Sequence, residues 1–339
     1  MSGADPAALS AMVRVENAVK RFGAFAAVDG VSFEVREGET FGLLGPNGAG
    51  KSTLIRLMTT LLPLTSGRVT IDGYDVDREP DEVRRTIGVI PQNLTSDLDL
   101  TVEENLHIYA KLYDMAPRER RTSVDELLGV VELTKWRKAQ TKTLSGGMRR
   151  RLEIARGLIH RPRVFFLDEP TTGLDPISRV GVWDMLARVQ GERRLTALIT
   201  THYMDEADRL CDRIAIIDHG RLAALDTPMA LKARVPGSNV IEVQFDPAPE
   251  GWADRLDGIP GVVSVHPEGG GMYRLLTAAG PATATALLQA AAASGAGITS
   301  LSVQNTTLDD VFVHFTGRQL RDEVVKPKGG LPPRPGVRP

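Results

Sequence analysis

Residues 45–52 read GPNGAGKS and match the pattern G-x-x-x-x-G-K-[ST] in full. An apolar run precedes them, and a segment of helical periodicity follows, which we expect to span residues 51–62. Glycines let backbone N–H groups turn toward phosphate oxygens, and the start of a helix favours an anion. In such a loop Lys51 would reach the β- and γ-phosphates, and Ser52 would ligate Mg²⁺. The alternative, an ordinary glycine-rich turn, explains less of the pattern.

A second segment with chemical potential is RVFFLDEP, residues 163–170. Its apolar residues predict a buried strand, with Asp168 and Glu169 at the carboxyl end, where open α/β sheets bind ligands. Asp168 fits a carboxylate linked to Mg²⁺ through water, and Glu169 fits a base that orients the attacking water. A strand-end turn with two solvated acids is the plainer alternative.

The segment LSGGMRRRLEIARG, residues 144–157, poses a different question. Ser145 has no adjacent base, which argues against a nucleophile, and no aromatic residue lies among the arginines, which argues against a nucleic-acid surface. Gly146 and Gly147 allow backbone N–H groups to approach an anion closely at the start of the following helix. The arginines at 149–151 point to different helix faces, so we expect one or two at most to face a ligand or partner, and the rest to be solvated.

Together these motifs, in this order, resemble the nucleotide-binding subunit of an ABC transporter over residues 12–235. The family's other motifs match an aromatic residue in VKRFG, a glutamine in IGVIPQN, an aspartate in GLD and a histidine in ITTHYMDEA. These four residues are Phe22, Gln92, Asp175 and His202. One position departs from the family: the usual signature has glutamine where this chain has Met148, which keeps the volume but loses an amide.

The resemblance implies a role for each matched residue. Phe22 would stack on adenine, and Val28 would pack against the ribose. The residues implied to act in catalysis are Lys51, Gln92, Glu169 and His202. Those implied to hold the triphosphate are Asn47, Gly48, Ala49, Gly50, Lys51, Ser52 and Thr53. Those implied to ligate Mg²⁺ are Ser52, Gln92 and Asp168.

The same resemblance implies that a second copy of the chain completes each site. Two copies would meet head-to-tail and enclose two ATP–Mg²⁺. The residues that would contact the nucleotide of the other copy are Ser145, Gly146 and Gly147. Asp175 is also implied to contact nucleotide.

Several of these residues also have a plainer interpretation. Phe22 could belong to the core, and Gln92 could be a polar loop residue. His202 could be an ordinary hydrogen-bonded histidine at a strand end, and Asp175 could cap the helix that begins after it.

The elements around the motifs indicate an α/β fold. Short β-like runs fill residues 12–44, and the pattern GRVTIDGYDV at 67–76 predicts a hairpin with an Asp-Gly turn. A helical pattern over 101–136 opens at Thr101, with Glu104 three residues later as in a capping box. Helices and apolar strands then alternate from 146 to 220, which predicts a parallel sheet. Together with this pattern, the resemblance implies a P-loop NTPase fold of ABC type, with an antiparallel β subdomain and a helical subdomain at about residues 94–160.

A different pattern follows the linker-like RVPGSN at 234–239. The order β-α-β-β-α-β predicts a small ferredoxin-like α+β accessory domain over residues 236–318. Its ending, TLDDVFVHFTGR, resembles the drug-exporting subclass exemplified by the daunorubicin/doxorubicin resistance ATPases. Its role stays open between dimer stabilisation, regulation and ligand sensing. Residues 319–339 carry five prolines and three glycines, so we expect a disordered tail.

Composition restricts the location and the partners. The net charge of −2 gives no basic field for nucleic acid, and one cysteine, Cys211, indicates a reducing compartment. The sequence has no signal-peptide pattern and no run of about 18 strongly apolar residues. We therefore expect a peripheral protein on the cytoplasmic face of the membrane, held there by a separate integral membrane permease.

The function implied by the resemblance is ATP hydrolysis that drives export of a hydrophobic drug or antibiotic. The closest alternative is the ATPase subunit of a lipid or polysaccharide exporter. DNA-repair ATPases with the same signature carry a long coiled-coil insertion, and the spacing from Lys51 to Asp168 leaves room only for a modest helical subdomain. Translation factors of the superfamily have two cassettes in one chain, whereas this chain has one set of motifs.

Overall fold

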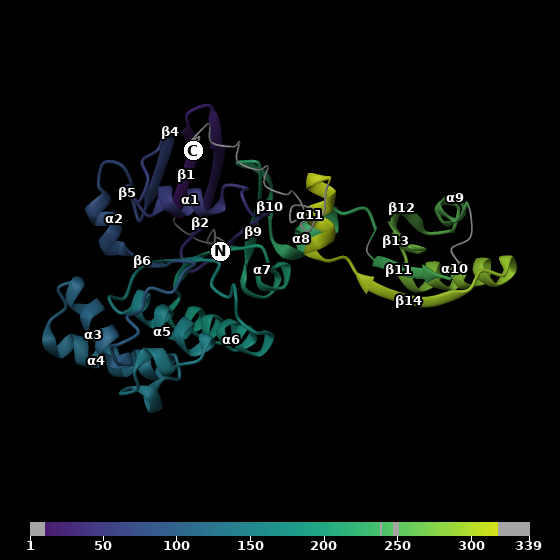
Figure 1. The fold of residues 1–339 in the computed structure, drawn as a ribbon. Helices are drawn as coiled ribbons and strands as arrows, with labels where there is room; N and C mark the ends of the chain where they lie inside the picture. The colour runs from purple at the N-terminus through teal and green to yellow at the C-terminus, as the bar shows by residue number, and fades with distance from the viewer. Residues whose placement is uncertain (1–10, 238, 247–250, 318–339) are drawn as a thin grey trace, which may run out of the picture.

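The computed structural model describes residues 11–237, 239–246 and 251–317 of the chain (Figure 1). Within these residues the strands form three sheets. Two of them lie in the first two thirds of the chain, and the third is formed after residue 238. The tail expected at 319–339 lies outside the described residues.

The first sheet is antiparallel, in the order β2-β1-β4-β5. Its strands are β1 (Ala11–Phe22), β2 (Phe25–Arg36), β4 (Ser66–Ile71) and β5 (Tyr74–Asp75). Asp72 and Gly73 join β4 to β5 with φ values of 51° and 86°. Two successive positive φ values are what a tight hairpin turn requires, so the predicted Asp-Gly turn is confirmed.

The second sheet has six strands, in the order β10-β9-β3-β8-β7-β6. They are β3 (Thr40–Leu44), β6 (Ile87–Ile90), β7 (Val164–Asp168), β8 (Thr196–Thr201), β9 (Arg213–Asp218) and β10 (Arg221–Asp226). All neighbours are parallel except β9 and β10. The carboxyl ends of β3, β6, β7 and β8 therefore meet at one edge, and each leads directly into a predicted motif.

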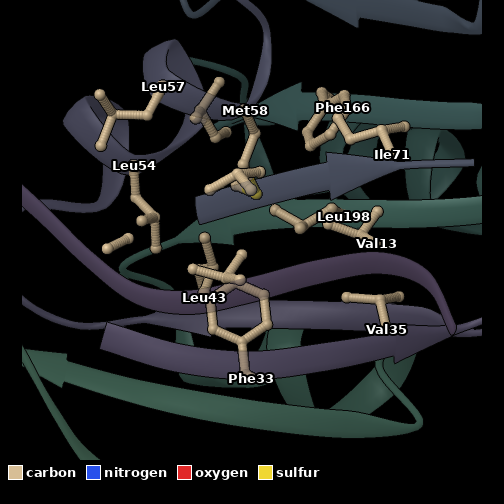
Figure 2. Close-up of a cluster of buried hydrophobic side chains, with 14 of the residues drawn as sticks. Val13, Phe33, Val35, Leu43, Leu54, Leu57, Met58, Ile71, Phe166 and Leu198 are labelled. Atoms are coloured by element: carbon tan, nitrogen blue, oxygen red, sulfur yellow. The ribbon is translucent and has the colours of Figure 1, made fainter. Parts of the chain in front are cut away.

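One hydrophobic cluster locks the two sheets and the first helix together (Figure 2). Phe33 of the antiparallel sheet packs in the same cluster as Leu43 of β3, Phe166 of β7 and Leu198 of β8. Helix α1 (Lys51–Met58) adds Leu54 to it. The strands that carry the candidate motifs are thus held by shared apolar burial, which gives the sheet edge a fixed geometry.

Helix α1 is shorter than the expected 51–62. Thr59 caps it, and Thr60 has a left-handed φ of 62°, which ends the helical hydrogen-bond ladder. The helical subdomain contains α3 (Val102–Leu112), α4 (Pro117–Val130) and α5 (Gly146–Leu158). Short helical turns lie between α4 and α5 at Thr134–Trp136 and Thr141–Thr143. The predicted capping box of Thr101 and Glu104 is present at the start of α3.

Four more helices surround the parallel sheet. They are α2 (Pro80–Thr86), α6 (Pro176–Arg193), α7 (Met204–Leu210) and α8 (Pro228–Arg234). Strand β10 and helices α2 and α8 were not anticipated from the sequence.

The third sheet has the order β12-β13-β11-β14 and is antiparallel throughout. Its strands are β11 (Asn239–Phe245), β12 (Val262–Gly269), β13 (Met272–Thr277) and β14 (Ile298–Asn305). Helices α9 (Trp252–Asp257) and α10 (Gly280–Ser294) share one apolar cluster with it. The connectivity and strand order confirm the predicted ferredoxin-like β-α-β-β-α-β arrangement.

The last described helix, α11 (Leu308–Thr316), packs mainly in the cluster of α7 and α8. Leu308, Val311 and Phe312 are buried in one cluster with Met204 of α7 and Leu231 of α8, and Figure 1 shows α11 beside α8. The chain therefore leaves the region of α7 and α8, forms the third sheet and comes back.

The outgoing and returning segments run side by side. Thr306 Oγ1 donates to the carbonyl of Gly237 at 3.0 Å, and the Asn239 side-chain amide donates to the Asn305 side chain at 3.1 Å.

Candidate functional site

The phosphate-loop candidate has a backbone that only glycine fits at two points. Gly50, the N-cap of α1, has a φ of 107°, and a Cβ there would lie 2.4 Å from the carbonyl oxygen of Ala27 in β2. A Cβ on Gly45 would lie 2.2 Å from the carbonyl oxygen of Ile217 in β9. The loop is thus packed against both sheets, and its shape is fixed before any ligand arrives.

Lys51 points back into this loop. Its Nζ donates to the carbonyls of Gly45 at 2.7 Å and Pro46 at 3.0 Å, and the residue is only 4% exposed. The same Nζ lies 3.9 Å from Oε1 of Glu169. The structure therefore places the loop lysine and one acid of the 163–170 segment at a single point.

Asp168 is held by two hydroxyl groups. Ser52 Oγ donates to its Oδ1 at 3.1 Å, and Thr200 Oγ1 donates to the same oxygen at 2.6 Å. The parallel register of β7 and β8 sets Asp168 opposite Thr200, which explains the second contact. Sequence reasoning missed Thr200, because a fully buried threonine in an apolar strand reads as a packing residue.

The Ser52–Asp168 pair supplies a hydroxyl and a carboxylate oxygen, the donor types that Mg²⁺ prefers. Among the residues that the structure describes, no group of three or more His, Cys, Asp or Glu side chains is arranged to hold a metal ion. A site with one carboxylate suits Mg²⁺ that takes its other ligands from water and substrate phosphates. The donor set fits this ion.

Glu169 is the most contacted side chain of the site. Its Oε2 accepts from Gln92 Nε2 at 2.9 Å and from Thr172 Oγ1 at 3.1 Å. His202 Nδ1 lies 3.2 Å from its Oε1, a close contact that lacks the alignment of a hydrogen bond. The residue has a left-handed φ of 48°, a conformation that costs energy for a side chain with a Cβ and is typical of functional positions.

The surroundings of Glu169 favour its ionised form. Burial alone would raise the pKa of this carboxyl, but the His202 contact, the Lys51 charge and the Thr172 hydrogen bond outweigh it. The net effect lowers the pKa below its ordinary value of 4.5. At neutral pH the group is a carboxylate, the form that accepts a proton.

The two residues expected near the base and sugar differ in exposure. Phe22, at the end of β1, is 51% exposed, with Lys20 Nζ 5.4 Å from its ring centre, so the interpretation as a core residue is wrong. Val28 is 1% exposed and belongs to the core cluster, which counts against direct contact with a ribose. Phe25, which pairs with Phe22 across the hairpin and is also exposed, has no counterpart among the predicted residues.

Ser145 is the N-cap of α5, and its Oγ accepts from the Met148 N–H at 3.2 Å. Ser145 and Gly146 are exposed, and Gly147 is buried so tightly that a Cβ would lie 2.9 Å from Ser178 Oγ. The start of this helix is thus exposed, and its N–H groups could donate hydrogen bonds to an anion. Met148 is half-buried against the core of the helical subdomain.

The expected distribution of the arginines is wrong. Arg150 is 3% exposed, and Arg149 and Arg151 are half-buried. The guanidinium of Arg150 donates to the carbonyls of Pro91, Glu169 and Pro170, which lie far from it in the sequence. Charge patterning along the helix could not reveal these acceptors, because they are backbone atoms of other loops.

Asp175 is the N-cap of α6. Its side chain accepts from the Ser178 N–H at 2.9 Å, so the capping interpretation is confirmed. A contact with nucleotide stays a prediction for this exposed residue.

Comparison with known proteins agrees with this geometry. The family model "ABC transporter" matches residues 28–172, and the model "ATP-binding protein DrrA1-3-like, C-terminal domain" matches residues 227–316. The chain is 37% identical over 313 residues to the linearmycin resistance ATP-binding protein LnrL of Bacillus subtilis, which covers 92% of this chain and 100% of the relative. The chain belongs to the ATP-binding proteins of ABC transporters. It is therefore an ATPase that binds and hydrolyses ATP.

Other relatives of this ABC ATPase are equally well covered. It is 41% identical over 325 residues to the daunorubicin resistance protein DrrA2 of Streptomyces coeruleorubidus, across 93% of this chain and 98% of the relative. It is 38% identical over 311 residues to the Nod factor export ATP-binding protein I of Ralstonia nicotianae, across 92% of this chain and 95% of the relative.

A solved structure, the dimeric post-hydrolysis state of the ATP-binding cassette MJ0796 bound to ADP and Pi, matches with a TM-score of 0.57. The two chains are 29% identical, and the match covers 64% of this chain and 98% of the other. Within the described part of the ABC ATPase, no helix combines the length and the apolar character needed to cross a bilayer.

Proposed function

We propose that this ABC ATPase acts as a head-to-tail homodimer that drives a separate integral membrane permease, at the cytoplasmic face of the membrane, to export a hydrophobic drug or antibiotic. The carrying observation is the exposed start of α5, where Ser145 and Gly146 present hydrogen-bond donors to the outside of their own chain. A phosphate bound by a second copy would accept from them. The relative solved as a dimer with ADP and Pi supports this arrangement.

The proposed chemistry is transfer of the γ-phosphoryl group to water. Such a reaction needs neutralised charge and an aligned nucleophile more than covalent help. Ser52 and Asp168 would hold Mg²⁺, with Gln92 as a further candidate ligand, and the ion would supply charge neutralisation on the phosphates. Lys51 would leave its loop carbonyls for phosphate oxygens, and His202 would add a further contact there.

Glu169 would hold the attacking water and accept its proton. Its carboxylate form and its contacts with Gln92, Thr172 and His202 fit this task. As the proton moves from the water to Glu169, the water oxygen would bond to the γ-phosphorus, and the bond from that phosphorus to the β–γ bridging oxygen would break, so that ADP leaves with the electron pair on that oxygen.

Glu169→Gln tests the role of the base. We expect ATP affinity within about threefold of wild type and a fall in kcat of at least about a hundredfold, because the amide cannot accept the proton. The matched control is Glu132→Gln, an exposed carboxylate paired with Arg151 and Arg188, which should hydrolyse ATP at the wild-type rate. Wild-type turnover by Glu169→Gln would remove the assignment.

Mixing variants tests the dimer. Lys51→Ala subunits and Ser145→Arg subunits are each expected to be inactive alone. In a mixed dimer both lesions fall in one composite site, so the other site is intact and activity should reappear. If mixtures are no more active than the separate variants, the sites do not form between two chains.

The cargo class rests on the names of the relatives. Two of them confer resistance to linearmycin and daunorubicin, which favours a hydrophobic drug or antibiotic. The Nod factor export relative keeps a second candidate, export of lipid or polysaccharide, in view. ATPase stimulation in vesicles that contain the permease, by a panel of hydrophobic antibiotics against lipids and oligosaccharides, separates the two.

A further inference from the structure

We propose that Arg150 is a positioning residue for hydrolysis, which fixes the loop of Gln92 and the loop of Glu169 to the helix that begins at Ser145. This inference deepens the proposed function and rests on it. It assigns a task to a side chain that the sequence pattern alone placed among surface arginines.

The contacts of Arg150 come from one planar group. Nη2 donates to the carbonyl of Glu169 at 2.8 Å, Nη1 donates to the carbonyl of Pro91 at 2.9 Å, and Nε donates to the carbonyl of Pro170. Pro91 directly precedes Gln92, and Glu169 carries the proposed base. One guanidinium therefore ties both sides of the Gln92–Glu169 hydrogen bond to α5.

A buried cation among backbone carbonyls is an expensive way to hold a fold. Removing an ion from water has a large unfavourable free energy even after relaxation, and hydrophobic packing of similar volume is often as stable. Only arginine offers donors spread over a rigid planar fork, so it can reach three carbonyls from two loops at once. Lysine would place one compact ammonium at the same point.

The conformation of Glu169 explains why such a clamp is needed. Its φ of 48° is unfavourable for a residue with a Cβ, so the surrounding structure must hold it. The backbone N–H of Glu169 is held by Thr200, and its carbonyl accepts from Arg150 at 2.8 Å and from the Thr172 N–H at a longer 3.3 Å. Without Arg150 only the longer Thr172 contact would hold this carbonyl, so the peptide after Glu169 could turn further and the carboxylate would move relative to the phosphate loop.

The neighbouring arginine provides a matched control. Arg151, the next residue on α5, is half-buried and pairs with Glu132, with a weaker contact from its guanidinium to the carbonyl of Gly181 at 3.4 Å. It contacts neither the Gln92 loop nor the Glu169 loop. Arg151→Met removes the same group from the same helix and leaves those two loops untouched.

The experiment compares Arg150→Met, Arg150→Lys and Arg151→Met in the full chain, with steady-state ATP hydrolysis, ATP affinity and thermal unfolding measured for each. We expect Arg150→Met to lose about ten- to a hundredfold in kcat, with ATP affinity within about threefold of wild type, because a shift of the base by about 1 Å affects the reaction and not the binding. Arg150→Lys should fall between wild type and Arg150→Met, and it keeps the test available if Arg150→Met does not fold. Arg151→Met should keep kcat within about twofold.

A double-mutant cycle with Gln92→Ala provides a readout that a merely structural role would not move. If Arg150 acts through the Gln92–Glu169 pair, the combined loss in kcat of Arg150→Lys with Gln92→Ala should be smaller than the product of the single losses. A combined loss equal to the product would overturn the proposal. So would folded Arg150→Met and Arg150→Lys proteins with wild-type kcat.

Failure of the proposed function gives a different result. In that case Glu169→Gln would leave ATP hydrolysis unchanged, both in the otherwise wild-type chain and in the chain that also carries Arg151→Met. If Glu169→Gln lowers kcat but the Arg150 variants keep the wild-type kcat, the role of Arg150 is rejected and the proposed function is not.

Discussion

At the scale of single residues, the site is a set of charges and hydroxyls in contact before a nucleotide is bound. Lys51 occupies loop carbonyls, Asp168 accepts from Ser52 and Thr200, and Glu169 lies between Gln92 and His202. Each of these partners is one that a triphosphate and Mg²⁺ would replace or extend. The groups are pre-organised, because folding has already fixed their positions before ATP binds.

The lowered pKa of Glu169 has a consequence for stability. A carboxyl whose pKa is depressed in the folded protein contributes stability above its unfolded pKa of about 4.5, and loses it as pH falls through the folded value. We therefore expect the difference in Tm between wild type and Glu169→Gln to be constant from about pH 6 to 8, and to shift against the wild type below about pH 4.5. Calorimetry of both proteins across this range checks it. A difference that moves in favour of the wild type as pH falls toward about 4.5 would mean that the pKa is raised, and would contradict the assignment.

Thr200 is a second residue with a testable effect. Thr200→Val keeps the shape but removes the donor to Asp168 and one acceptor of the Glu169 N–H. We expect a cost of about 1–3 kcal/mol in stability and a fall in kcat of roughly tenfold. Thr196→Val, in the same strand, removes a hydroxyl that accepts from the Gly38 N–H at 2.9 Å, far from the site. It should lose stability and keep kcat; equal losses of kcat in both variants would show that Thr200 has no special role.

At the scale of elements, the site is made by strands that end together. Parallel register brings the ends of β3, β7 and β8 to one edge, and the packing of β2 against the phosphate loop closes it from the other sheet. The shape of the loop therefore depends on contacts between elements more than on its own hydrogen bonds.

Gly50 is the point where that dependence can be measured. Gly50→Ala would push a Cβ to 2.4 Å from the Ala27 carbonyl, at a φ of 107°. We expect it to weaken ATP binding at least tenfold and to destabilise the protein by more than the roughly 1–2 kcal/mol of a left-handed alanine. Gly23→Ala, at a φ of 61° with open space around it, should show only that smaller cost. Isothermal titration with ATP and denaturant unfolding measure the two effects, and equal losses at both positions would contradict the role of the Ala27 contact.

Most elements around the site could be predicted from the sequence. The strands at 164–168 and 196–201 are apolar runs bounded by turn signals, and Thr101 and Glu104 announce a helix start. The short helix α8 and the edge strand β10 escaped prediction because their patterns are brief and half-exposed.

The residues that could not be predicted are those whose role depends on a distant backbone atom. Arg150 donates to carbonyls 19 to 59 positions away in the sequence, and Thr200 donates to Asp168 on the neighbouring strand. No local periodicity encodes such contacts. The motif residues were found because their spacing within one loop carries the chemistry.

At the scale of the whole molecule, two family models match separate parts of the chain, residues 28–172 and 227–316. We keep as a proposal that residues 12–235 form the nucleotide-binding domain, with the helical subdomain at about 94–160, and that residues 236–318 form the accessory domain. The contacts add that α11 lies with α7 and α8 and buries Phe312 there. Arg274 of β13 also donates to Asp310 of α11 at 2.6 Å, so α11 contacts the third sheet as well as α7 and α8.

Truncation tests the importance of α11. A chain that ends at Val235 loses the helix that covers Met204 and Leu231, so we expect a lower Tm and increased binding of a hydrophobic dye. A chain that ends at Gly317 keeps α11 and should melt like the full protein. Thermal unfolding and dye fluorescence of the two truncated chains decide the matter. Equal Tm values for both would show that α11 adds nothing to the nucleotide-binding body.

The side-by-side chain segments at Gly237 and Thr306 have a further consequence. Residues 239–305 are an insertion between α8 and α11, and hydrogen bonds already join its two ends. Closing a loop costs entropy that grows only with the logarithm of its length, so the size of the inserted module matters little to its host. A short turn or a foreign domain with adjacent termini could therefore replace residues 239–305, while α11 stays packed against α7 and α8.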